Sequence, residues 1–245
     1  MIVGFVGSGS MAAAIARGWA GEFEAMLFSD SGSGRAAELA GELGGEVAAN
    51  AEIAERADLV VLAVKPAALE AVAPELAAAR SVVSVLAATP LERVAAAFPG
   101  AEVLRVMPNV GVEVRKGVLC VAGSAPAAVR EKLALLGHVV ELPDEDFDEA
   151  TAVMGCAPAY LALAVEALAD AGERAGLDAE LARELVVETT AGTAELLRLR
   201  HPADVRRAVS SPGGSTEAGL EALDREGARA AFEAAVDASL ERMRR

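Results

Sequence analysis

Short apolar runs and longer amphipathic stretches alternate along the chain as far as residue 141. The apolar runs predict buried strands, and the stretches between them repeat apolar residues at helical spacing. The predicted strands are residues 2–6, 25–28, 46–48, 59–64, 81–86, 102–106, 118–122 and 138–141, and the predicted helices are 13–20, 35–43, 52–56, 67–79, 91–98 and 127–136. Strands that alternate with helices form mostly parallel sheets, so the pattern predicts an α/β fold with a Rossmann-type doubly wound sheet.

Beyond residue 143 the periodicity is helical only. An acidic run at residues 144–149 forms a connector or a first helical turn, and long helical patterns follow at 159–175 and 181–199. A helix that is apolar nearly all round has to be covered by more than one neighbour, which indicates burial against a second subunit. The pattern therefore predicts two domains, residues 1–145 with the sheet and residues 146–245 as an all-helical dimerisation domain.

The strand at residues 2–6 runs directly into a glycine turn and a helix. Gly7 permits the tight turn, Gly9 lets the backbone approach a pyrophosphate, and Ala12 is small where the helix meets the strand. Asp30 follows the next strand about 20 residues later, as the dinucleotide fingerprint expects. Strand, turn and helix in this order predict a dinucleotide site, and Lys65 follows a further strand at the sheet edge where a cofactor would pass.

Two sets of side chains give opposite indications about the dinucleotide. Asp30 could accept hydrogen bonds from both ribose hydroxyls of NADH. Four neighbours could instead surround the additional phosphate of NADPH: Ser29, Ser31, Ser33 and Arg35. A third alternative is that residues 31–34 form a flexible turn and Arg35 begins a solvated helix face. The sequence leaves NADPH and NADH both open.

The composition restricts the possible partners. Hydrophobic residues make up 53% of the 245 residues and support a sizeable core, although only 3% are aromatic. A formal net charge of −15 argues against nucleic acid and anionic membranes, which bind clustered Lys and Arg. No segment is expected to span a membrane. Cys120 and Cys156 have neither zinc-site nor disulfide spacing, so no metal site is predicted and both are expected to be buried thiols in the cytoplasm.

Residues 210–220 have the composition of a second anion-binding loop. Gly213 and Gly214 allow backbone geometries that other residues avoid, and Ser215 or Thr216 can cap the helix that follows. Backbone donors at the start of a helix suit a carboxylate or a phosphate. The alternative is an ordinary turn between two helices, which the local composition alone favours.

A series of short motifs runs along nearly the whole chain. The motifs are Gly7-Ser8-Gly9-Ser10-Met11-Ala12, Asn50 with Ala63-Val64-Lys65-Pro66, Met107-Pro108-Asn109, Phe147-Asp148 with Thr151, Pro158-Ala159-Tyr160, and Ser211-Pro212-Gly213-Gly214-Ser215-Thr216. In this order they resemble the pyrroline-5-carboxylate reductase family. The resemblance implies a Rossmann domain, a helical domain that dimerises by interleaving helices, and reduction of 1-pyrroline-5-carboxylate to proline by NADPH or NADH.

The resemblance also implies roles for individual residues. The expected cofactor contacts, with those of the fingerprint included, are Gly7, Ser8, Gly9, Ser10, Met11, Ser29, Asp30, Asn50, Ala63, Lys65 and Pro66. The expected substrate contacts are Ser211, Gly213, Gly214, Ser215 and Thr216. Thr216 matches the threonine that hydrogen-bonds the ring nitrogen, while Gly214 and Ser215 would offer donors to the carboxylate. Hydride transfer to an imine needs no nucleophile or metal, so positioning is expected to dominate.

Three short segments depart from the family pattern. Gly155-Cys156-Ala157-Pro158 stands where the family usually has Gly-Ser-Gly-Pro, Val110-Gly111 stands where a proline usually follows, and Ala87-Ala88 replaces an Ala-Gly pair. These departures leave two alternatives open: a related reductase of another small imino or oxo acid, and a noncatalytic nucleotide-binding paralogue. Taken over the whole chain, however, the motifs favour residues 210–220 as the substrate loop of the reductase.

Overall fold

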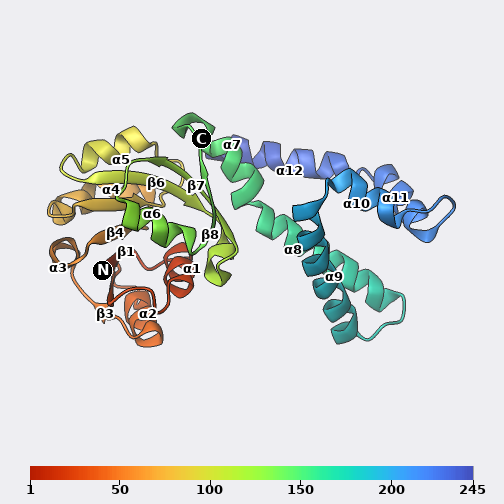
Figure 1. Cartoon of the computed structure of the whole chain (residues 1–245), viewed down its shortest axis with the longest axis horizontal. Coiled ribbons are helices and arrows are strands. Elements are labelled where there is room, and N and C mark those ends of the chain that lie inside the picture. The colour runs from red at the N-terminus through yellow and green to blue at the C-terminus, as the bar shows by residue number, and fades with distance from the viewer. Residues whose placement is uncertain (245) are drawn as a thin grey trace. The chain divides into compact units, whose positions relative to one another are not determined.

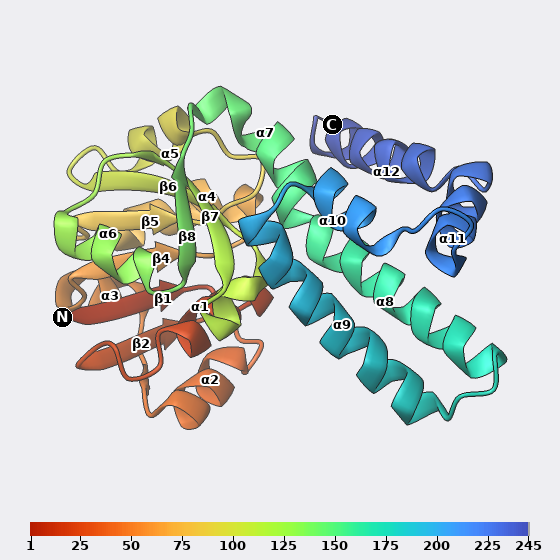
Figure 2. The same cartoon turned by 45° about the vertical axis from the view of Figure 1, so that its right-hand side comes forward.

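The computed structural model describes residues 1–244, which form two compact units (Figures 1 and 2). The first unit holds residues 1–156 together with Met243 and Arg244, and the second holds residues 157–242. Contacts thus group the turns between residues 144 and 156 with the sheet. The functional division after residue 145 stays a prediction.

The first unit is built on one eight-stranded sheet (Figure 1). Its strands are β1 (Ile2–Val6), β2 (Ala25–Ser29), β3 (Glu46–Val47), β4 (Leu59–Leu62), β5 (Ser81–Ser84), β6 (Glu102–Pro108), β7 (Gly117–Gly123) and β8 (Gly137–Glu141). They lie in the order β3-β2-β1-β4-β5-β6-β7-β8, and only β6 and β7 pair antiparallel. This arrangement confirms the predicted α/β fold with a doubly wound, mostly parallel sheet.

Two hydrophobic cores cover the two faces of the sheet. The helices of the first unit are α1 (Ser10–Gly18), α2 (Arg35–Leu43), α3 (Asn50–Arg56), α4 (Leu69–Val72), α5 (Leu91–Ala97) and α6 (Ala127–Ala134). Alternate residues along each strand point to opposite faces, so Phe28 packs in the core beside α1, α2 and α6, while its neighbour Leu27 packs beside α3 and α5. Phe28 stacks on Phe5 with ring centroids 5.1 Å apart.

The prediction of a single helix at residues 67–79 is wrong. The segment instead forms three short turns, η1 (Pro66–Ala68), α4 and η2 (Ala73–Leu76). Pro74 lies in the first turn of η2, where its ring and missing N–H cannot continue the preceding helix. The strand predicted to reach Val64 ends at Leu62, and Ala63 and Val64 line a cleft.

Short helical turns connect the sheet to the second unit. They are η3 (Val110–Val114), η4 (Asp144–Asp146), α7 (Phe147–Ala150) and the π-helical turn η5 (Thr151–Gly155). The backbone of Cys156 is helical, with φ −86°, and Ala157 begins the next helix, so neither position needs the freedom of a glycine. The departure at Cys156-Ala157 is therefore compatible with the local backbone. Cys156 is half-buried rather than buried as expected, while Cys120 is buried.

The second unit consists of helices alone and buries little of its own apolar surface. Its helices are α8 (Ala157–Arg174), α9 (Ala179–Leu199), α10 (Pro202–Val209), α11 (Ser215–Arg225) and α12 (Ala228–Met243). Helices α8 and α9 pack side by side (Figure 2), and the Tyr160 hydroxyl lies 2.6 Å from the Ser239 hydroxyl, which joins α8 to α12. Among the described residues of this unit, Ala182 is the one apolar side chain that is fully buried.

Large apolar side chains remain exposed along the helices of this unit. Leu161, Leu163 and Leu168 of α8 are exposed by 59%, 64% and 60%. An apolar surface of this kind on a folded chain marks an interaction site. By length and composition, the helical stretch Asp144–Arg174 is also apolar enough to cross a membrane, so the expectation that no window would reach that threshold is wrong for this segment.

Candidate functional site

A cleft of about 490 Å³ opens at the carboxyl ends of β1, β2 and β4. In the sheet order, β1 lies between β2 and β4, where successive crossovers run in opposite directions. Ligands of open α/β sheets bind at this switch point. Eight of the predicted cofactor residues line the cleft: Gly7, Ser8, Gly9, Ser29, Asp30, Asn50, Ala63 and Lys65.

The glycine turn has the space that a dinucleotide requires. Gly7 has a φ of +93°, and a Cβ there would lie 2.6 Å from the carbonyl oxygen of Ala63. A Cβ on Gly9 would meet no protein atom within 4 Å, although Gly9 lines the cleft. The turn thus packs at Gly7 against the backbone that follows β4 and leaves open space at Gly9, where a pyrophosphate can approach the start of α1. These residues fit the cofactor.

Ser8, Ser29 and Asn50 form the wall of the cleft through hydrogen bonds to one another. The Ser8 hydroxyl donates to the carbonyl oxygen of Ser29 at 2.9 Å, and the Ser29 hydroxyl donates to Asn50 Oδ1 at 2.6 Å. Asn50 Nδ2 donates in turn to Glu75 Oε2 at 2.8 Å. This series fixes the end of β2 against the start of α3.

Three predicted cofactor residues lie outside the cleft. Ser10 lines an adjoining hollow of about 360 Å³ that shares Ser8, Gly9 and Arg35 with the cleft. Met11 packs against the hydrophobic core, and Pro66 begins η1. Their contacts with a cofactor stay predictions.

Asp30 accepts hydrogen bonds from its own loop. Its Oδ1 accepts the Gly32 N–H at 2.7 Å, and its Oδ2 accepts the Ser33 hydroxyl at 2.8 Å and the Ala36 N–H at 2.9 Å. These hydrogen bonds lower the pKa of Asp30 to about 2, and the bond from the Ala36 N–H has the largest effect. The carboxylate therefore stays ionised at neutral pH and holds the loop between β2 and α2.

The predicted substrate loop lies between α10 and α11 of the second unit. Gly213 has a φ of +74°, and its N–H donates to Glu217 Oε2 at 2.7 Å. The Gly214 N–H donates to the carbonyl oxygen of Ser211 at 2.9 Å, so it is not a vacant donor as expected.

Helix α11 begins without a side-chain cap. Gly214 is the N-cap residue and Ser215 is the first residue of the helix, so the expectation that Ser215 or Thr216 caps it is wrong. The N-cap residue is a glycine, which has no side chain to accept an N–H, and the Glu217 carboxylate accepts the Gly213 N–H just before the helix. The Ser215 and Thr216 side chains are exposed, and their hydroxyls are not used as caps.

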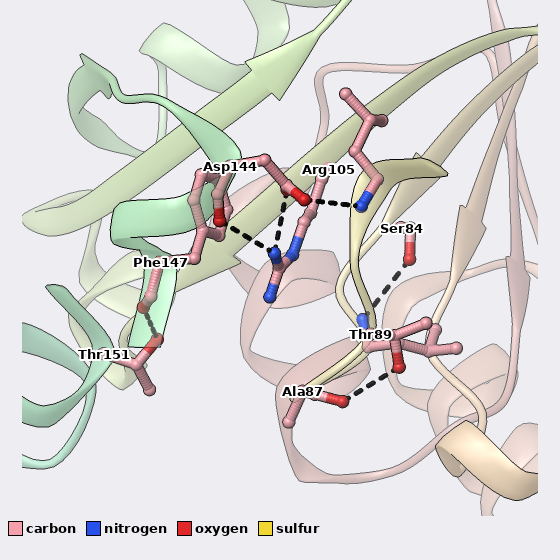
Figure 3. Close-up of polar contacts among 9 residues, drawn as sticks. Ser84, Ala87, Thr89, Arg105, Asp144, Phe147 and Thr151 are labelled. Atoms are coloured by element: carbon pink, nitrogen blue, oxygen red, sulfur yellow. Dashed lines mark hydrogen bonds and ion pairs between the residues drawn. The ribbon is translucent and has the colours of Figure 1, made fainter. Parts of the chain in front are cut away.

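A buried ion pair fixes the segment that leaves the sheet for the helices (Figure 3). Arg105 on β6 is 3% exposed, and its Nη1 donates to Asp144 Oδ1 at 2.8 Å. The guanidinium carbon lies 4.3 Å from the centre of the Phe147 ring. Asp144 Oδ2 also accepts the Leu91 N–H at 3.0 Å, so one carboxylate joins β6, α5 and η4.

Replacing Asp144 with alanine is expected to destabilise the first unit by about 3 kcal/mol, because it leaves the Arg105 guanidinium buried without its carboxylate. Chemical unfolding followed by the single Trp fluorescence, from Trp19 in the first unit, measures this change. The double variant Arg105→Met with Asp144→Leu removes both charges and should recover most of the loss. Equal losses in the single and double variants would contradict this role for the pair.

The other two departures differ in how well the backbone accommodates them. The Gly111 N–H donates to Asn109 Oδ1 at 3.2 Å, a bond that a proline at residue 111 could not make. Asn109 Nδ2 reaches the carbonyl oxygen of Met154 at 3.2 Å. Ala88 has a φ of +48°, in the left-handed region that glycine adopts more readily, so the Ala-Gly pattern of the family has a structural reason there.

Some cleft residues were missed by sequence reasoning. Val64, Ala68 and Val72 line the cleft, and Glu75 holds Asn50 in its wall. The break of the predicted helix into short turns places Ala68, Val72 and Glu75, and Pro66 and Pro74 are the signals of this break in the sequence. The described residues contain no cluster of three or more His, Cys, Asp or Glu side chains that could hold a metal ion.

The parallel sheet, the glycine turn and the cleft at the switch point define a dinucleotide-binding protein of the Rossmann class. Residues 2–88 match the family model described as NADP oxidoreductase, coenzyme F420-dependent. Residues 144–245 match the model described as pyrroline-5-carboxylate reductase dimerisation.

Relatives that match most or nearly all of the chain belong to the same family. The pyrroline-5-carboxylate reductase of Synechocystis sp. is 38% identical over 79% of this chain and 76% of the relative. The crystal structure of 1-pyrroline-5-carboxylate reductase from Streptococcus pyogenes has a TM-score of 0.89 at 31% identity and covers 99% of this chain and 98% of that one. The Plasmodium falciparum pyrroline carboxylate reductase, solved with NADP bound, has a TM-score of 0.85 at 26% identity and covers 99% and 97%.

The chain belongs to the pyrroline-5-carboxylate reductase family and is an NAD(P)H-dependent oxidoreductase. The dimerisation match spans the helices whose leucines are exposed, including the stretch that is apolar enough for a membrane span. Oligomerisation therefore accounts for this apolar surface.

Proposed function

We propose that this protein reduces the cyclic imine 1-pyrroline-5-carboxylate to L-proline with NADPH or NADH, the last step of proline biosynthesis. The observation that carries the proposal is the likeness to the Streptococcus pyogenes reductase over 99% of the chain, through both units. The cofactor supplies the hydride. The work of the protein is to bind, orient and shield the reactants.

In this proposal the first unit binds the dinucleotide. Gly7 shapes the turn, Gly9 leaves the space for the pyrophosphate, and Lys65 lines the same cleft. Ser8, Ser29 and Asn50 act through the hydrogen bonds that hold this wall in place. Asp30, Ala63 and Ser10 belong to the same predicted set, with Asp30 and Ala63 in the cleft and Ser10 in the adjoining hollow. Met11 and Pro66 complete the set on the family motifs alone.

The loop between α10 and α11 binds the substrate. The N–H groups in the first turn of α11 have no intrahelical acceptor, and the Gly213 N–H already holds one carboxylate, that of Glu217. A substrate carboxylate suits the same kind of donors, together with the Ser211 and Ser215 hydroxyls. The Thr216 hydroxyl hydrogen-bonds the ring nitrogen and orients the C=N bond for hydride transfer.

The protein acts as a homodimer, or as a higher homo-oligomer built from dimers, in the cytoplasm. The exposed leucines of α8 and the dimerisation match over residues 144–245 support the dimer. A net charge of −15 disfavours nucleic acid as a partner.

Steady-state oxidation of NAD(P)H by the purified protein tests the proposed reaction. The value of kcat/KM is expected to be at least ~10-fold higher for 1-pyrroline-5-carboxylate than for a six-membered cyclic imino acid, because a site shaped for one ring discriminates against an added methylene. The reverse order would identify a related reductase of another imino acid. Cofactor binding without any turnover would identify a noncatalytic paralogue.

A further inference from the structure

We propose that Glu217 is an internal competitor of the substrate carboxylate: its own carboxylate holds the Gly213 N–H until the carboxylate of the substrate displaces it. The inference rests on the proposed function, because it assigns a specificity-determining residue to the loop that binds the substrate there. Glu217 belongs neither to the expected substrate contacts nor to the family motif that ends at Thr216.

The Glu217 side chain reaches back past the start of its own helix. It is the third residue of α11, and its Oε2 accepts the Gly213 N–H at 2.7 Å. A glutamate at this position ordinarily accepts the N–H of the N-cap residue, which is Gly214 here. The Gly214 N–H donates instead to the carbonyl oxygen of Ser211 at 2.9 Å. The Gly213 N–H, one residue before the cap, therefore binds a carboxylate that the loop itself supplies.

This carboxylate is held by a neutral donor and by no cation. Other acids of the same unit form ion pairs with arginines, as Glu180, Asp204 and Asp224 do. Within residues 1–244 no Lys or Arg forms an ion pair with Glu217, and the bond from the Gly213 N–H is the one hydrogen bond of its side chain. A carboxylate held by one neutral donor is displaced more readily than one held by a cation.

The loop is accessible to a second carboxylate. Gly213 is exposed, and a Cβ built on it would meet no protein atom within 4 Å. Two carboxylates within hydrogen-bonding distance of one N–H repel each other. The substrate carboxylate therefore has to displace that of Glu217, and the apparent affinity for the substrate is lowered by the fraction of the protein in which Glu217 is bound. A ring without a carboxylate leaves Glu217 in place.

A competing role and a purely structural role of Glu217 lead to opposite results when its charge is removed. If Glu217 only holds the shape of the loop, Glu217→Gln weakens the binding of a carboxylate ligand, because the amide oxygen accepts a weaker hydrogen bond. If Glu217 competes with the ligand, the same change strengthens that binding, because a neutral amide is displaced more readily and does not repel a carboxylate.

Isothermal titration calorimetry with L-proline and with L-prolinamide tests the proposal on the full chain. We expect Glu217→Gln to bind L-proline about 5-fold more tightly than the unaltered protein, because a hydrogen bond to a charged acceptor exceeds one to a neutral acceptor on this scale. L-Prolinamide has no carboxylate, and its binding should not be strengthened. In steady-state kinetics the KM for 1-pyrroline-5-carboxylate should fall by a similar factor while kcat stays unchanged, a split that a disturbed fold would not produce. Glu217→Ala also frees the Gly213 N–H and should change L-proline binding in the same direction.

The matched control is Glu221→Gln, which removes the same charge from an exposed side chain one turn further along α11 and should leave both affinities unchanged. Thermal unfolding of each variant checks that the fold persists. Unchanged or weaker L-proline binding by both Glu217 variants, or an equal gain in Glu221→Gln, would overturn the proposal. Failure of the proposed function is distinguishable, because the unaltered protein would then not turn over 1-pyrroline-5-carboxylate, whereas an overturned proposal leaves that turnover intact.

Discussion

Replacing Thr216 with alanine is expected to lower kcat for 1-pyrroline-5-carboxylate about 100-fold, the effect of removing one hydrogen bond to a reacting group. The affinity for NADPH should be unchanged, because Thr216 belongs to the helical unit and the cofactor cleft to the sheet unit. Steady-state kinetics and calorimetric titration of NADPH separate the two effects.

Thr216 can be replaced without removing a contact that stabilises its helix. Its side chain is exposed and its hydroxyl does not cap α11, so the loss of that hydroxyl should not disturb the helix. Thr216→Ser keeps the hydroxyl and should retain most of the activity. Thr190→Ala is a control, because the Thr190 hydroxyl bonds only the carbonyl oxygen of Val186 within α9. Full activity in Thr216→Ala would eliminate the proposed role.

Replacing Gly9 with alanine is expected to weaken NADPH binding on the order of 100-fold while leaving the stability of the protein intact. The added methyl group would meet no protein atom within 4 Å, and the φ of −77° suits alanine. It would therefore occupy only space that the pyrophosphate needs. Fluorescence titration of NADPH and thermal unfolding measure binding and stability separately.

Gly7→Ala is the matched comparison, because the same methyl group is added two residues earlier. Here a Cβ would lie 2.6 Å from the Ala63 carbonyl oxygen at a φ of +93°, so we expect a loss of stability of about 3 kcal/mol. We therefore expect the two glycines to have different functions, one in folding and one in binding. A large loss of stability in Gly9→Ala, or none in Gly7→Ala, would be inconsistent with this division.

Much of the fold follows from local patterns in the sequence. The strand at Ile2–Val6, the glycine turn and α1 were predictable because a buried strand, a positive φ and a helix start each have their own residue preferences. The alternation of strands and helices then predicted the sheet. The substrate loop was predictable only from its motif, since its local composition also suits an ordinary turn.

The hydrogen bonds of the site could not be predicted in the same way. Asn50 meets Ser29 and Glu75, which lie 21 and 25 residues away in the chain, and no local pattern encodes such a contact. The hydrogen-bond donors to Asp30 are local in the sequence. An acidic residue at the end of β2 can, however, accept hydrogen bonds either from a ribose or from its own loop. Only the folded loop separates those alternatives. Gly214 was likewise expected to offer a donor to the substrate, but its N–H donates to the carbonyl oxygen of Ser211.

Transfer of deuterium from NADPH labelled at C4 of the nicotinamide tests the central claim most directly. The purified protein is incubated with 1-pyrroline-5-carboxylate, and the product is analysed by mass spectrometry and NMR. With the hydride-donating position labelled, we predict L-proline that carries one deuterium at the carbon of the former C=N bond. Oxidation of the cofactor without labelled proline, or no reaction with either NADPH or NADH, would contradict the proposed function.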